Sequence, residues 1–118
     1  MFAIVGFLVA TLAYHFIRGS RWEELKKKYR ITGPPSVKLD YLQSAILNEA
    51  ACNLIGLGIN STGIYIKVFT CIFIPFSDLE PTGKKKHLLY DEFRIKGTDL
   101  TIGLNSYWSE KVTSNHPH

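Results

Sequence analysis

Few side chains in this sequence could serve as a nucleophile, base or metal ligand. The candidates are Cys52, Cys71, His87, Asp91, His116 and His118. His87 and Asp91 are four residues apart, a spacing that places both on one face only in a helix, whereas residues 88–90 read as a strand. Neither cysteine has a base close in sequence, and the cysteines and histidines lack zinc-site spacing. The sequence therefore predicts a non-enzymatic protein without metal or cofactor.

Two further patterns could bind an anion. Gly56 and Gly58 lack the third glycine and the following helix of a dinucleotide site, so we expect them to admit a bulge or a closely approaching backbone. Lys84, Lys85 and Lys86 form a basic segment that could contact a phosphorylated headgroup or an acidic partner. The alternative is a solvated loop, and no small-molecule ligand is expected.

The positive charge of the chain is concentrated near its N-terminus. The 118 residues carry a formal net charge of +4. Residues 1–17 have no charged side chain, and residues 18–30 hold six basic and two acidic ones. The basic and acidic side chains of residues 31–118 are equal in number, so their charges cancel. Basic groups would spread over the surface of a nucleic-acid-binding fold, so this distribution argues against nucleic acid as a partner.

An apolar sequence, FAIVGFLVATLAYHFI, occupies residues 2–17. As a helix it would span roughly 24 Å, against about 30 Å for a hydrocarbon core. Residues 1–18 are therefore predicted to be a transmembrane anchor; a buried core helix and a signal peptide are the alternatives. The basic block that follows predicts a single-pass protein with its N-terminus outside and its C-terminal domain cytosolic.

Small residues recur along the predicted anchor at spacings of three and four. They are Ala3, Gly6, Ala10 and Ala13. On a helix they would share one face, which favours close packing against another transmembrane helix. This pattern supports the alternative of an accessory subunit in a larger membrane complex, although small residues are also common in membrane helices generally.

Residues 19–31 are predicted to form an amphipathic juxtamembrane helix. Ser20 and Glu23 have the spacing of a capping box, and an apolar stripe follows, made of Trp22, Leu25 and Tyr29. The helix also carries a basic set, Lys26, Lys27, Lys28 and Arg30, which is expected to lie on anionic lipid or to be solvated while the stripe packs on the domain. Residues 32–36 form a Gly/Pro linker.

Residues 37–113 are predicted to form a small β-rich domain. Alternation over residues 37–41 indicates a strand, and residues 54–59 and 64–69 flank turn residues typical of a hairpin. Further strands are expected at 71–76, 88–90, 93–96 and 100–104, and Ser106 is expected to cap a final helix. The predicted fold class is α+β, with an N-terminal transmembrane helix, an amphipathic helix, a small antiparallel sheet or partly open barrel, and a C-terminal helix. Residues 114–118 form the tail.

Three segments resemble a known group of proteins. They are the helix from Gly19 to Tyr29 with its W-x-x-L-x-x-x-Y pattern, the strands around Leu57–Asn60 and Gly63–Ile66, and the segment Ile74–Leu79. The chain is similar here to small bacterial membrane-anchored proteins of unknown function, and the last segment is similar to one in pleckstrin-homology-like and GRAM-like domains. The resemblance implies a membrane-attached domain with a pleckstrin-homology-like sheet. We therefore expect a membrane-tethered interaction domain on the cytosolic face of a bacterial inner membrane, with the accessory subunit as the alternative.

Overall fold

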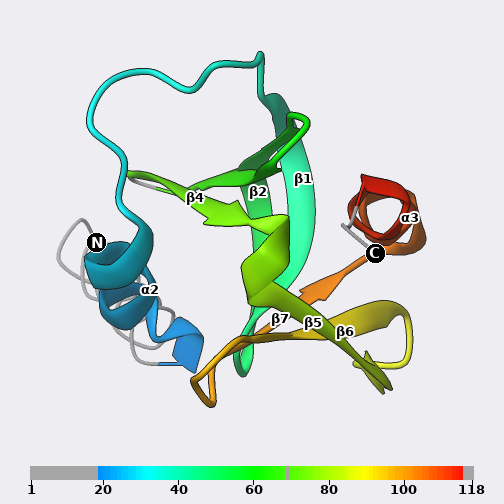
Figure 1. Cartoon of the computed structure of the whole chain (residues 1–118). Helices are drawn as coiled ribbons and strands as arrows, with labels where there is room; N and C mark the ends of the chain where they lie inside the picture. The colour runs from blue at the N-terminus through cyan, green and yellow to red at the C-terminus, as the bar shows by residue number, and fades with distance from the viewer. Residues whose placement is uncertain (1–18, 69, 116–118) are drawn as a thin grey trace, which may run out of the picture.

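One antiparallel sheet organises the molecule. The computed structural model describes residues 19–68 and 70–115. The sheet has seven strands in the order β4-β3-β2-β1-β7-β6-β5 and curves into a half-barrel (Figure 1). Its strands are β1 (Asp40–Leu47), β2 (Ala50–Ile59), β3 (Gly63–Lys67), β4 (Cys71–Pro75), β5 (Leu79–Lys86), β6 (Tyr90–Ile95) and β7 (Thr101–Leu104).

Short helices complete the described fold. Helix α2 spans Trp22–Tyr29, the 3-10 helix η1 spans Phe76–Asp78 between β4 and β5, and α3 spans Ser106–Asn115. In Figure 1, α2 lies beside β4 at one end of the half-barrel and α3 lies at the other end, against β6 and β7. Side chains of both helices join the residues of the sheet in one hydrophobic core.

The predicted fold class is wrong, because the described part of the chain is mostly β. Seven strands form the sheet, whereas α2 and α3 contain 8 and 10 residues. The prediction of a β-rich domain is confirmed. The predicted anchor at residues 1–18 lies outside the described residues. Within residues 19–68 and 70–115, no helix is long and apolar enough to cross a membrane.

The β2–β3 hairpin forms where the sequence predicted it. Ile59 pairs with Ile64 across the turn. The Asn60 side chain holds the turn, because its Oδ1 accepts hydrogen bonds from the backbone N–H groups of Thr62 at 2.8 Å and Gly63 at 3.0 Å. This is the Asx-type contact for which asparagine is favoured in turns.

The first and fifth strands differ from the prediction. The expected strand at 37–41 is displaced, because β1 begins at Asp40 and has register shifts before Ala45. Leu39 instead packs against Gly58, where an added Cβ would lie 2.7 Å from its Cδ2. A side chain thus makes the close approach that was expected of a backbone, since the nearest backbone atom, the Lys38 carbonyl oxygen, would lie 3.4 Å from that Cβ. The expected strand at 88–90 is wrong, since residues 87–89 form the turn between β5 and β6.

Helix α2 buries the predicted stripe but begins differently. Trp22, Leu25 and Tyr29 are buried, as expected. The predicted capping box is wrong, because the N-cap residue is Arg21, in a left-handed conformation with φ of 53°, and no side chain caps the helix. The Arg21 guanidinium instead bridges Glu24 and Asp99, whose Oδ2 lies 3.0 Å from Nη1. A salt bridge to the β6–β7 turn thus replaces the capping contact.

Helix α3 also uses another cap than the predicted one. Asn105 Oδ1 accepts a hydrogen bond from the Trp108 backbone N–H at 3.2 Å, so Asn105 occupies the capping role expected of Ser106. The helix extends through Asn115, and residues 114–115 of the predicted tail are therefore helical. Residues 116–118 lie outside the described part of the chain.

A hydrogen bond between α2 and η1 makes the free energy of unfolding change with pH in the alkaline range. The Tyr29 hydroxyl donates to Asp78 Oδ2 at 2.8 Å. Burial, reinforced by this bond and by the carboxylate charge, raises the pKa of Tyr29 far above its usual range. The folded state therefore favours the protonated phenol, and this contribution is complete below the unfolded pKa of about 10 and is lost as pH rises from there toward the folded pKa.

We expect Tyr29→Phe to lower the free energy of unfolding by about 2 kcal/mol at pH 7, since the bond joins a charged acceptor. Urea unfolding at pH 7 and pH 11 would check this. The wild-type protein should lose more stability between the two values than the variant does. Equal losses in both proteins would contradict the linkage.

Candidate functional site

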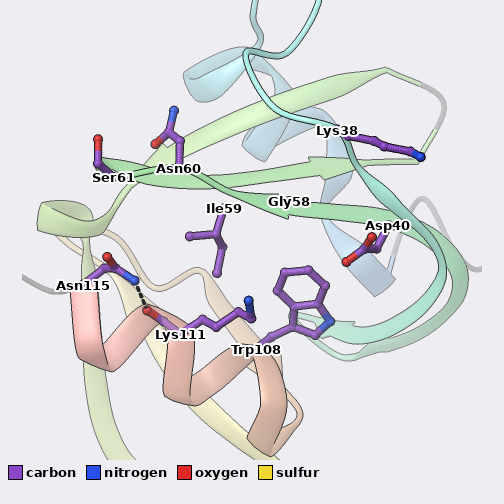
Figure 2. Close-up of a pocket in the computed structure, with 9 residues that line it drawn as sticks. All are labelled: Lys38, Asp40, Gly58, Ile59, Asn60, Ser61, Trp108, Lys111 and Asn115. Carbon is purple, nitrogen blue, oxygen red and sulfur yellow. Dashed lines mark hydrogen bonds between the residues drawn. The ribbon is translucent and has the colours of Figure 1, made fainter.

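The candidate binding site is a groove between α3 and the β2–β3 turn. It has a volume of about 530 Å³ and is lined by Lys38, Asp40, Gly58, Ile59, Asn60, Ser61, Trp108, Lys111 and Asn115. Figure 2 shows Lys111 and Trp108 projecting from α3 into the space below the hairpin, with Ile59 facing them from β2. The groove thus joins segments from three separate parts of the sequence.

Trp108 forms the floor of the groove and is held in place. This side chain is 3% exposed, and its Nε1 donates to Gln43 Oε1 at 3.0 Å, which fixes the indole against β1. The ammonium group of Lys111 lies 4.9 Å from the centre of the Tyr107 ring and 6.0 Å from that of Trp108. A cation over two aromatic rings is favourable by the cation–π interaction.

The groove combines groups that suit binding. It offers the ammonium of Lys111, the carboxylate of Asp40 and the polar side chains of Asn60 and Ser61 beside an apolar floor. In Figure 2 the Lys38 side chain extends away from the middle of the groove. Such a mixed surface can accept a polar segment with an apolar portion.

The sequence did not predict this groove. In sequence, Asn60 and Ser61 indicate only a turn, and Trp108 indicates only an apolar position in the last helix. The site requires α3 to lie against a hairpin that precedes it by about 45 residues. Lys111 and Asn115 are ordinary polar residues of a helix in sequence, so no local signal identifies the site.

The basic residues predicted on the juxtamembrane helix divide into two groups. Lys26 Nζ bonds Glu23 Oε1 at 3.0 Å, so its charge is paired. Lys27, Lys28 and Arg30 are exposed, and no ion pair to an acidic side chain is found for them in the described part of the chain. These three residues, two in the last turn of α2 and one at its C-cap, are called the basic face of α2. Lipid or partner contact by this set stays a prediction.

The second predicted basic cluster lies on a strand instead of a loop. Lys84, Lys85 and Lys86 belong to β5, the edge strand. Lys85 bonds Asp91, and this partner, followed by the Ser109 hydroxyl, holds the pKa of Asp91 below its usual range. Lys86 is half-buried and donates to the Asn48 carbonyl at 2.9 Å. Lys84 is exposed, so the three lysines do not act as one cluster.

The structure does not bring the candidate chemical groups together. Cys71 begins β4 at one edge of the sheet, whereas His87 lies at the tip of the β5–β6 hairpin on the opposite side in Figure 1. Burial raises the pKa of Cys52 to about 11 and also raises that of Cys71. Within the described residues, no three His, Cys, Asp or Glu side chains are grouped to hold a metal.

Several predicted residues lie outside the described part of the chain. Ala3, Gly6, Ala10 and Ala13 belong to residues 1–18, and His116 and His118 to residues 116–118. Helix packing through the four small residues therefore stays a prediction.

No protein-family model, curated protein or solved structure matches the chain. The similarity to pleckstrin-homology-like and GRAM-like domains accordingly rests on the sequence segments alone.

Proposed function

We propose that this chain is a membrane-attached interaction domain that binds a partner on the cytosolic face and catalyses no reaction. The observation that carries the proposal is the uncharged apolar sequence of residues 2–17, which leads directly into a folded β domain. The exposed basic face of α2, made of Lys27, Lys28 and Arg30, follows this apolar sequence closely in the chain. Anionic lipid attracts such a basic segment at about 1 kcal/mol per residue near the surface.

The groove supplies the binding role. The Trp108 side chain that forms its floor is fixed by a hydrogen bond to Gln43, while Lys111, Asn60 and Ser61 offer donors and acceptors at its rim. A preorganised site of this kind costs little conformational entropy on binding. In this proposal the apolar sequence attaches the domain to the membrane, and the groove binds the cytosolic partner.

Attachment is tested by cell fractionation of the full chain. The variant Val9→Lys/Leu12→Lys places two charges in the apolar sequence and is expected to move most of the protein from the membrane fraction to the supernatant. The matched control, Thr113→Lys/Ser114→Lys, adds the same charges at exposed positions of α3 and should stay with the membrane. Membrane recovery of both variants, or of neither, would overturn the proposal.

A further inference from the structure

The β5–β6 hairpin ends in an apolar tip that faces water. Leu88 is 87% exposed and its neighbour Leu89 is 76% exposed. A single exposed leucine is ordinary on a protein surface, but two adjacent ones at the end of a hairpin form an apolar point that adds nothing to the core. Their presence is therefore not explained by the stability of the domain.

The backbone of the same tip is strained. His87 has φ of 47° and Leu88 has φ of 69°, so both adopt the left-handed conformation. Glycine and asparagine favour that conformation, whereas a leucine bears a steric cost in it. Strain of this kind persists where the side chain serves a contact outside the domain.

Basic side chains flank the tip. The segment of residues 84–92 contains three lysines and two carboxylates. Lys84 is exposed, and Lys85 keeps 60% of its side chain exposed even though it bonds Asp91. The two leucines lie at the end of the hairpin, and the lysines lie next to them on the strand. This order suits the interface of an anionic bilayer, where acyl chains lie beneath phosphate groups.

We infer that the β5–β6 hairpin tip is a second membrane contact, in which Leu88 and Leu89 enter the interface of an anionic bilayer while Lys84 and Lys85 face its phosphates. This inference rests on the proposed membrane attachment. The arrangement in Figure 1 suits it, because the hairpin tip, the β6–β7 turn and the start of α2 all reach the lower edge of the ribbon. One flat surface can therefore meet the start of α2 and the tip together.

The test measures the environment of a fluorescent label on the full chain. A single NBD group is attached at Leu88→Cys in a Cys71→Ser background, since Cys52 is buried and stays unlabelled. The labelled chain is reconstituted in phosphatidylcholine vesicles with or without phosphatidylglycerol. The matched control carries the label at Ser114→Cys, an exposed position of α3.

We expect the label at residue 88 to show a blue-shifted emission, with at least about threefold stronger quenching by nitroxide lipids than the label at residue 114. Lys84→Glu/Lys85→Glu should bring the signal in anionic vesicles to that in neutral ones. A chain that sediments with vesicles while its residue-88 label stays in water would overturn the inference alone. A chain that does not sediment would overturn the attachment as well.

Two further measurements separate a lipid contact from a structural role of the leucines and from a protein partner at the tip. With the label moved to Leu89→Cys, the added change Leu88→Gly should abolish the blue shift yet keep or raise the urea midpoint, because glycine relieves the positive φ. A lower midpoint would assign the leucine a structural role. A blue shift seen in native membranes but absent from pure lipid vesicles would assign the tip to a protein partner; both results overturn the inference.

Discussion

The variant Asn48→Ala is expected to lose about 3 kcal/mol of unfolding free energy, because one buried side chain joins three segments. Asn48 is 3% exposed. Its Nδ2 donates to the Ser20 carbonyl at 2.5 Å, and its Oδ1 accepts from the Thr101 backbone N–H at 2.7 Å. Alanine removes both bonds, so the part-buried N–H of Thr101 loses this acceptor.

Backbone conformation adds to this cost. Asn48 has φ of 56°, a left-handed conformation that asparagine tolerates better than alanine. Asn48→Gly removes the same two hydrogen bonds without that penalty, so it should be more stable than Asn48→Ala by about 1 kcal/mol. Urea unfolding of the two variants separates the two contributions. A change of less than about 1 kcal/mol in both would contradict the role assigned to the side chain.

The Asn48 contacts also bear on the proposed attachment. Ser20 is the second described residue after the apolar sequence, and Glu49 N–H donates to the Gly19 carbonyl at 3.1 Å beside it. The β1–β2 turn is therefore hydrogen-bonded to the chain where the chain enters the domain. Hydrogen exchange along α2 should accelerate in Asn48→Ala, because the start of the helix loses this connection.

Local patterns predicted the elements whose sequence and packing agree. The Trp22, Leu25 and Tyr29 stripe has helical spacing and faces the core. The hairpin around Asn60 combines a turn residue with flanking strands that contain β-branched residues. Each signal lies within about ten residues, which is why single-sequence reasoning found it.

The missed elements depend on contacts between distant residues. Strand β5 contains Pro81, Gly83 and three lysines, a composition typical of a loop, and it is a strand because it pairs with β6 at the sheet edge. Proline and lysine are tolerated there since an edge strand leaves one side unpaired. The Arg21 bridge to Asp99 likewise replaces a predicted cap by a contact across 78 residues. The α+β class was wrong because strands such as β2, with 10 residues, and β5, with 8 residues, are longer than local composition indicated, so the described part of the chain is mostly β.

Gly63→Ala is expected to be the more disruptive of two glycine substitutions. Gly63 begins β3 opposite Pro75, and an added Cβ would lie 2.4 Å from the Ile74 carbonyl oxygen and 2.5 Å from Phe73 Cζ. The first contact is with backbone, so β3 and β4 must move apart to relieve it. We expect a loss of at least about 3 kcal/mol, at the upper end of overpacking.

Gly58→Ala is the matched comparison, because its added Cβ would meet the Leu39 side chain at 2.7 Å and backbone only at 3.4 Å. The end of a leucine side chain can rotate away, so this variant should lose about 1 kcal/mol. Urea midpoints of the two variants, with the wild type as reference, measure the difference. If Gly63→Ala proved no less stable than Gly58→Ala, the tight β3–β4 pairing at this turn would be refuted, and with it the geometry that positions Asn60 over the groove.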